Sequence, residues 1–406
     1  MRKSNCKSPF GYIALIAVIL IVGFPLTVTA CLWDRDTLAA EGRGMPDVIA
    51  VLTGRFERNP NLYYEMRLSR IESQLKTQPQ DLESFDDAGV ACDRLGRHDD
   101  AIAWMVRKKG LIDALDASNP DIRTHLYRYH ANYGTFLVHR WISQGADRSK
   151  IQEVEVACKE IAKALEINPD AHFGREKYQL QAMQWILNPP KIEPYSPLPS
   201  FIKWQSGMLY DEMPDPDDVE HTVNGLAGLV SLGNAWNSVD VFYALSTALQ
   251  LYTKGFEPTR HGGRNSLAYL AWLRCNELID QGGNSLLVDS PRGEMLKQKL
   301  YLPDFPNPEM SLDRTFRDLR DEADQWHAER NAFMLNRLKS GVHPDTDLNF
   351  WDGYTDRIAP ALPPVSVITV FENWQSFKTK TVLAALVGVP LLLLGGIGWI
   401  MLRRRT

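Results

Sequence analysis

The sequence of 406 residues predicts an all-α protein. Apolar residues recur at helical spacing over most of residues 60–340, and Gly or Pro residues stand where these periodic segments stop. Residues 365–371 are the one segment that reads as a short strand or as extended chain. Two long uncharged apolar runs also predict a transmembrane helix on either side of the helical region.

Charge is segregated along the chain. All 50 acidic residues lie between Asp34 and Glu372, and residues 32–377 have a formal charge of −13. Such an acidic region argues against non-specific nucleic-acid binding, which requires Lys and Arg to neutralise phosphates. The same region is rich in Trp, Tyr, Leu and Ala, so it is expected to fold. We therefore expect a folded region that does not bind nucleic acid.

The two apolar runs predict membrane segments at residues 9–31 and 381–402. Each is long enough to cross the hydrocarbon core of about 30 Å as a helix. Basic residues flank the runs at residues 2–7 and 403–405, and basic flanks are usually cytoplasmic. The expected location is therefore the membrane, with both termini cytoplasmic if the first segment is uncleaved and residues 34–377 extracytoplasmic.

Three alternatives remain open for the first apolar run. Val28-Thr29-Ala30 has the small residues that signal peptidase prefers, which predicts a cleaved signal sequence. Together with the next residue this segment is similar to a bacterial lipobox, which makes Cys31 a candidate for lipidation. The run is longer than the apolar core of about 7–15 residues in a signal peptide, which favours an uncleaved anchor.

The first helical hairpin is predicted from a 34-residue pattern that begins at Leu82. Gly89 and Ala101 take positions 8 and 20, where small residues let two helices approach closely. Gly96 falls in the turn between the helices, where a left-handed backbone favours glycine. Position 27, which is usually Ala, is Lys108, so the match to the pattern is incomplete.

The second hairpin is predicted from its C-terminal end. Ala157, Ala164 and Pro169 take positions 20, 27 and 32 of the same pattern. Gly134 would be position 8, but it lies 23 residues before Ala157 where 12 are expected. An 11-residue insertion must therefore lengthen the first helix of this hairpin or the turn after it.

Over roughly residues 60–187 the chain resembles tetratricopeptide repeat (TPR) proteins, with further helices at residues 62–78 and 172–187. The opening Cys-Leu-Trp-Asp-Arg-Asp-Thr-Leu of residues 31–38 is similar to that of bacterial membrane-anchored proteins of this kind. The resemblance implies TPR-like helical-hairpin repeats forming a right-handed solenoid within a domain of residues 34–188. It also implies a concave face that binds proteins or peptides, formed by positions 2, 5, 9, 12 and 13 of the first helix of each hairpin. In this sequence these positions hold Glu83, Asp86, Val90, Asp93, Arg94, Arg128, Ala131, Thr135, Val138 and His139.

A Pro-rich connection is predicted at residues 189–218, because its seven prolines cannot continue a helix. A second helical region of residues 219–340 follows, and its segments 219–253 and 264–281 are helical in pattern. Gly and Asn residues at 282–284 stop the second of these segments.

The clearest amphipathic helix is predicted at residues 311–339, where apolar residues alternate at spacings of four and three. We favour packing of this helix onto its own domain over a seam between two copies of the chain. Residues 341–378 contain four prolines and are expected to form an irregular stalk.

No motif in the sequence identifies a reaction. A phosphate-binding Gly loop, a His-Glu-x-x-His pair and a Gly-x-Ser-x-Gly elbow are all absent from the sequence. His125, His130 and His139 are close in sequence, but spacings of 5 and 9 do not place them on one helical face. We therefore expect no metal site and no cofactor, and we assign no catalytic residue.

Three kinds of function are considered. The first is a membrane-anchored, extracytoplasmic TPR-type scaffold for protein–protein interaction, whose acidic face holds a basic peptide or partner helix. The second is an enzyme with a site in residues 219–340, near Trp236, Tyr243, Trp272 and His261. The third is a structural tether with no ligand on the concave face. The resemblance favours the scaffold.

Overall fold

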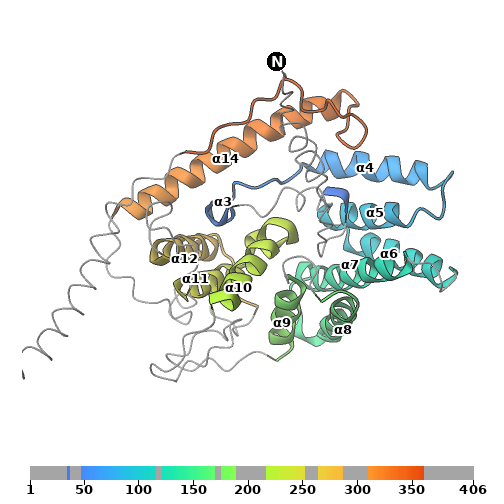
Figure 1. Ribbon diagram of the computed structural model, residues 1–406, viewed down its shortest axis with the longest axis horizontal. Helices are drawn as coiled ribbons and strands as arrows, with labels where there is room; N and C mark the ends of the chain where they lie inside the picture. Colours follow the sequence, from blue (N-terminus) through green and yellow to red (C-terminus); the bar gives the residue numbers. More distant parts are fainter. Residues whose placement is uncertain are drawn as a thin grey trace, which may run out of the picture.

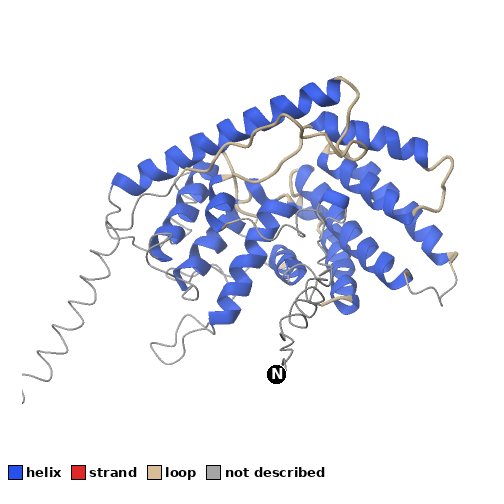
Figure 2. Ribbon diagram, turned by 45° about the horizontal axis from the view of Figure 1, so that its top comes forward, coloured by secondary structure: helices blue, strands red, loops and turns tan. Residues whose placement is uncertain are grey.

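The computed structural model describes residues 34–36, 47–115, 121–169, 175–188, 216–251, 264–286 and 310–360. The described residues form helices joined by turns and loops, without a strand, so the predicted all-α class is confirmed for them (Figures 1 and 2). The helices are α3 (Val48–Thr53), α4 (Asn61–Gln74), α5 (Leu82–Arg94), α6 (His98–Asp113), α7 (Ile122–Ser143), the short 3₁₀ helix η3 (Arg148–Lys150), α8 (Gln152–Ile167), α9 (Arg175–Leu187), α10 (Pro216–Gly228), the π-helical turn η5 (Leu229–Gly233), the 3₁₀ turn η6 (Ala235–Asn237), α11 (Val239–Leu251), α12 (Arg264–Asp280) and α14 (Met310–Lys339).

The helices from α4 to α9 form a stack in which each helix packs on the next one along the chain (Figure 1). Helices α10, α11 and α12 form a second group, which joins the stack through contacts between α9 and α10. Helix α14 runs across both groups and contacts α12, α3 and α4 (Figure 2). A single long helix therefore bridges the two groups of helices.

Small residues stand where the stacked helices approach most closely. A Cβ atom on Gly89 of α5 would lie 2.9 Å from the methyl of Met105 on α6. A Cβ atom on Gly134 of α7 would lie 2.9 Å from Ile161 and 3.0 Å from the backbone oxygen of Ala157 on α8. Gly96 turns the chain between α5 and α6 with φ of +73°. Within each predicted hairpin, the predicted glycine at position 8 therefore lies where the two helices approach closely.

The 11-residue insertion lengthens both the first helix of the second hairpin and its turn. Helix α7 has 22 residues, whereas α5 has 13. The connection to α8 is also long and includes η3. In this connection Trp141 donates its indole N–H to the backbone oxygen of Asp147 at 2.9 Å. The long turn is therefore fixed to the end of α7.

The segment predicted to be helical over residues 219–253 is interrupted in its middle. Helix α10 ends in η5, and η6 precedes the start of α11. Residues 233–238 read Gly-Asn-Ala-Trp-Asn-Ser, and Gly, Asn and Ser favour turns over helix interiors. The break is not predicted from the sequence, because apolar residues recur at helical spacing on both sides of it.

Helix α14 packs on its own domain, as predicted. Phe316, Leu319, Ala323 and Trp326 of the amphipathic pattern are buried. After the helix, residues 341–360 are irregular but fold back along α14, and Phe350 is only 1% exposed. The rest of the expected stalk, residues 361–378, lies outside the described residues.

A buried arginine joins three distant parts of the chain. Arg67 of α4 is inaccessible to solvent and forms ion pairs with Asp34 at 3.2 Å, Asp36 at 2.7 Å and Asp345 at 2.6 Å. Burial alone would lower the pKa of Arg67, but the surrounding carboxylates raise it well above its usual value. The guanidinium therefore stays charged and holds residues 34–36 and 341–360 against α4.

The expected membrane location requires correction. Among the described residues, no helix combines the length and the apolar character that crossing a bilayer demands. Helix α14 has 30 residues, but charged side chains occur along its whole length. The described residues therefore do not support the predicted membrane location, with residues 34–377 outside the cytoplasm. Both apolar runs, 9–31 and 381–402, and Cys31 lie outside the described residues.

Replacing Arg67 with Ala is expected to lower the free energy of unfolding by about 3–5 kcal/mol, because it removes the buried cation that Asp34, Asp36 and Asp345 share. Urea denaturation measures this change. Arg97→Ala is the control, since Arg97 pairs with Asp100 in solvent and should cost less than about 1 kcal/mol. Equal losses in the two variants would contradict the structural role of Arg67.

Candidate functional site

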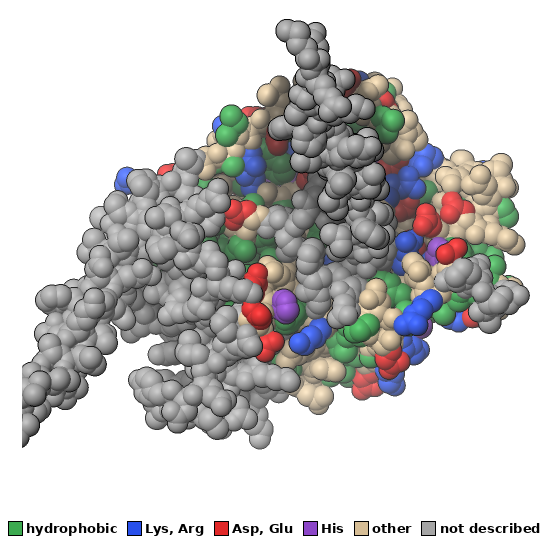
Figure 3. Space-filling model, in the orientation of Figure 1, with side chains coloured by type: hydrophobic (Ala, Val, Ile, Leu, Met, Phe, Trp, Pro, Cys, Tyr) green, Lys and Arg blue, Asp and Glu red, His purple; other side chains and the backbone are tan. Residues whose placement is uncertain are grey.

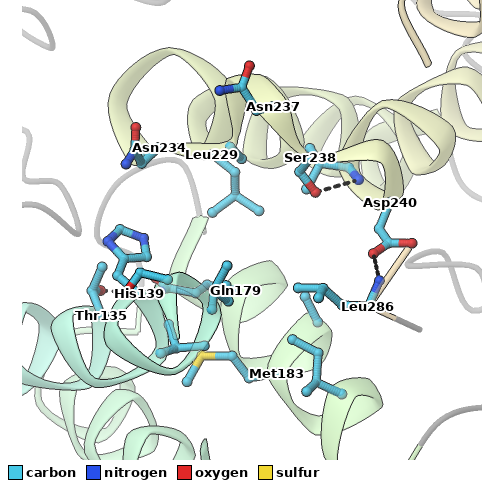
Figure 4. A pocket seen from close by; sticks show the side chains of 18 of the residues that line it. Thr135, His139, Gln179, Met183, Leu229, Asn234, Asn237, Ser238, Asp240 and Leu286 are labelled. Carbon is cyan, nitrogen blue, oxygen red and sulfur yellow. Dashed lines mark hydrogen bonds between the residues drawn. The ribbon is translucent and has the colours of Figure 1, made fainter. Parts of the chain in front are cut away.

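A cavity of about 410 Å³ lies between α7 and α9 on one side and η5, η6 and the start of α11 on the other (Figure 4). Apolar and polar side chains both line it. Its size is typical of ligand-binding sites. The polar lining residues are His98, Thr135, His139, Ser143, Arg175, Gln179, Asn234, Asn237, Ser238, Asp240 and Asn284.

Two helices provide one wall of the cavity through residues at helical spacing. On α7 the lining residues recur every three or four positions from residue 135 to residue 143, and on α9 they do so from residue 175 to residue 186. The opposite wall contains η5, and π-helical turns occur frequently at functional sites. The break in the second helical region therefore supplies one side of the cavity.

One buried carboxylate orients two histidines of the cavity. Asp93, near the end of α5, has a fully buried side chain that lies 3.0 Å from Nδ1 of His98 and 3.0 Å from Nδ1 of His139. The tight turn at Gly96 brings His98, the first residue of α6, back to Asp93. Asp93 itself does not line the cavity, whereas both imidazoles do.

The charge on Asp93 is strongly stabilised. Burial alone would raise the pKa of this carboxyl group, but the charge and hydrogen bonds of His139 and His98 hold it well below its usual range. An ionised carboxylate only accepts hydrogen bonds, so each Nδ1 donates to it. Asp93 therefore fixes the orientation of both rings and keeps a proton on each Nδ1.

A glutamine from α9 reaches across to α7. Gln179 donates its amide N–H to the hydroxyl of Thr135 at 3.0 Å, and that hydroxyl donates to the backbone oxygen of Ala131 at 2.8 Å. The second hydrogen bond uses the hydroxyl proton of Thr135, so Gln179 must present its nitrogen there. Its buried Oε1 finds no hydrogen-bond donor among the described residues.

The far end of the cavity contains a second carboxylate. Asp240, at the start of α11, accepts hydrogen bonds from the hydroxyl of Ser285 and from the backbone N–H of Leu286, the latter at 2.7 Å (Figure 4). Burial raises the pKa of Asp240 to about 6, although both hydrogen bonds favour the charged form. Asp240 thereby ties the residues after α12 to the cavity wall.

The structure brings the predicted face residues of α5 and α7 together. Glu83 pairs with Arg128 at 3.0 Å, and Asp93 contacts His139. Among them, Thr135, Val138 and His139 line the cavity. Val90 and Ala131 are buried in the helix packing instead.

Asp86 lies inside the protein rather than on a face open to solvent. It forms a 2.6 Å ion pair with Lys108, and both side chains are almost wholly buried. Asn132 of α7 donates to the other oxygen of Asp86 at 3.2 Å. Burial raises the pKa of Asp86 to about 6 and lowers that of Lys108, against the attraction between the two charges. The unusual lysine at repeat position 27 is therefore the partner of this aspartate.

Arg94 is engaged by the second helical region. Its guanidinium donates to the backbone oxygen of Leu232 at 2.7 Å and to the side chain of Asn234 at 3.4 Å. The chain itself therefore covers this part of the expected face. On the face seen in Figure 3, acidic and basic side chains of the described residues are interspersed, without a continuous acidic surface.

The alternative site proposed around Trp236 does not coincide with the cavity. Trp236 packs against Arg274, whose guanidinium carbon lies 3.8 Å from the ring centroid, and Tyr243 is buried. Trp272 stacks on a neighbouring tyrosine. None of these three residues lines the cavity, and His261 lies outside the described residues.

Comparisons with protein-family models, with curated proteins and with solved structures find no match to this chain. The residues that the structure describes also contain no group of three or more His, Cys, Asp or Glu side chains arranged to hold a metal ion.

Sequence reasoning missed several cavity residues. His98 had a usable signal, because it stands five residues after Asp93 across a Gly turn. Gln179, Asn234 and Asp240 had none, since they reach the cavity only through the packing of elements far apart in sequence.

Removal of one member of the Asp86–Lys108 pair should destabilise the fold strongly. Lys108→Met is expected to lower the free energy of unfolding by about 2–4 kcal/mol at pH 8, because Asp86 stays buried and charged. The loss should shrink at pH 5, where Asp86 takes up a proton. Urea denaturation at both pH values measures it.

Lys109→Met is the matched control, because Lys109 pairs with Asp113 in a more exposed position and should cost less than about 1 kcal/mol. An Asp86→Leu/Lys108→Met double variant should regain part of the lost stability. If Lys108→Met behaves like Lys109→Met at pH 8, the pair is not the buried contact described here.

The pKa of Asp240 predicts a pH dependence. Since its folded-state pKa of about 6 exceeds the ordinary value of 3.8, the folded state binds more protons in this interval, and stability falls as the pH rises from about 4 to 6. Asp240→Asn, which can accept from the Leu286 N–H and donate to the Ser285 hydroxyl, should remove about 1–3 kcal/mol of this decline. Thermal denaturation between pH 4 and 7 compares the two proteins; parallel curves would contradict the burial of an ionisable Asp240.

Proposed function

We propose that this chain is a TPR-like scaffold that binds a protein or peptide segment in the cavity between α7, α9 and η5–η6. The observation that carries the proposal is the position of the cavity on the repeat face. Thr135, Val138 and His139 line it, and these are three of the five α7 residues that the repeat pattern assigns to ligand binding. A binding role needs a preformed site of this kind and no catalytic residue.

The contacts between helices support the repeat assignment. The first helices of the two hairpins, α5 and α7, touch through the Glu83–Arg128 and Asp93–His139 pairs. Within the second hairpin, Gly134 faces the backbone of Ala157, as positions 8 and 20 of a repeat require. These neighbours are the ones that a stack of TPR-like hairpins implies.

The occupied parts of the face limit the size of the ligand. Asp86 is buried beneath α7, and Arg94 holds residues 232–234. A long peptide lying along the whole face would have to displace these contacts. A cavity of about 410 Å³ suits one or two side chains of a partner. We therefore propose recognition of a short anchor segment.

In-cell photocrosslinking tests the proposal with a benzophenone side chain at residue 143, which is exposed and lines the cavity. A discrete protein adduct is expected, and filling the cavity with Ala182→Trp should abolish it. The control position is residue 106 on α6, which is 55% exposed and away from the cavity. Adducts that are the same at both positions, or that persist after Ala182→Trp in a protein with unchanged circular dichroism, would overturn the proposal.

A further inference from the structure

We propose that the cavity recognises a primary ammonium group at the end of an apolar chain, as in a lysine side chain. This inference rests on the proposed function and names the chemistry of its ligand. It depends on the hydrogen-bonding groups that the cavity offers, on its apolar walls and on the charges around it.

The two histidines offer acceptors to a ligand. Asp93 accepts a hydrogen bond from Nδ1 of both His98 and His139, and in the neutral form of such a ring Nε2 is unprotonated and can accept a hydrogen bond. Neither Nε2 atom has a hydrogen-bond partner among the described residues, and both side chains retain some exposure, 12% and 18%. Two acceptor nitrogens, supported by one buried negative charge, are therefore left for a donor.

Gln179 contributes a third unused acceptor in the same lining. Its amide nitrogen is taken by Thr135, which fixes its oxygen as the free end, and this oxygen has no donor in the described part of the chain. An unsatisfied buried acceptor costs about 1–3 kcal/mol, so turning the Gln179 oxygen toward the cavity to meet a ligand donor is favourable. An ammonium group has three donors and no acceptor, which matches an acceptor-rich site.

The walls of the cavity suit the stem of a lysine. Side chains of Val138, Ile142, Met183 and Leu229 line the space next to the polar residues. A lysine side chain can bury its four methylene groups against such surfaces while its charged end makes hydrogen bonds. A compact polar cation would leave these walls without a contact.

The charges near the cavity are compatible with a cationic ligand. His98, on α6, and His139, on α7, both contact the carboxylate of Asp93. Asp240 of α11 adds a carboxyl group to the lining. Arg175 of α9 is the one permanently cationic lining residue, and it donates to the backbone oxygen of Gly228 at 3.4 Å. The formal charge of −13 on residues 32–377 also attracts cations from a distance.

Calorimetric titration of the full-length protein at pH 8 tests this inference. The ligands are a blocked tripeptide Ala-Lys-Ala, the same peptide with norleucine in place of Lys, and n-butylamine. We expect the Lys peptide to bind with a Kd of about 1 mM or tighter. The norleucine peptide, which keeps the apolar stem but lacks the ammonium group, should bind at least about tenfold more weakly, a difference of 1.4 kcal/mol. Comparable binding of n-butylamine would identify a small amine as a sufficient ligand, whereas binding of the peptide alone would identify a protein lysine.

Two histidine variants connect the binding to the site. His139→Asn should weaken binding of the Lys peptide at least about tenfold. His130→Asn should leave it unchanged, because His130 also lies on α7 with its Nδ1 2.6 Å from a carboxylate, that of Glu160, but does not line the cavity. His98→Asn serves as the second cavity variant if circular dichroism shows that His139→Asn is unfolded.

The outcomes separate the two proposals. Equal binding of the Lys and norleucine peptides would overturn the ammonium inference and leave the cavity as a binding site. Failure of both the Lys peptide and n-butylamine to bind would also overturn it, while the crosslinking result at residue 143 decides the proposed function independently. Equal effects of His139→Asn and His130→Asn would remove the histidine pair from the site.

Discussion

The arrangement of this protein depends on the buried guanidinium of Arg67. An unpaired charge inside a protein costs several kcal/mol, so the fold must bring carboxylates to it. Two of its partners, Asp34 and Asp36, precede the helical stack, and the third, Asp345, follows α14. Residues more than 300 positions apart, Asp34 and Asp345, thereby meet at α4. The result is a chain whose described ends are fastened to each other.

This constraint has consequences for the rest of the molecule. Once residues 341–360 are held at α4, helix α14 must run across the space between α4 and α12. Helix α12 packs on α11, and α11 follows directly after η5 and η6. The second helical region is therefore positioned from two directions, by α14 at one end and by contacts of α9 and Arg94 at the other. The cavity lies between this region and the helical stack, with α7 and α9 on one side and η5, η6 and α11 on the other.

The sequence predicted local features well because their causes are local. Gly96, Gly134 and the break after residue 281 each follow from a conformational or packing requirement that one residue satisfies. The amphipathic pattern of α14 likewise predicted a buried face. The cavity depends instead on pairs such as Gln179–Thr135 and Asp240–Leu286, which come from different helices. No periodicity in a single sequence encodes which helices will meet.

The two aspartates of the repeat pattern show that a sequence pattern can identify a residue's position in a helix without predicting its surroundings. The repeat pattern placed Asp86 and Asp93 on the concave face, where a partner was expected to contact them. Helix α7 covers them instead, and each acquired a compensating partner, Lys108 for Asp86 and two histidines for Asp93. A carboxylate that is surrounded in this way no longer attracts a ligand directly. Asp93 keeps a proton on Nδ1 of His98 and of His139, and both of these residues line the cavity, so its charge acts on the cavity through the two rings.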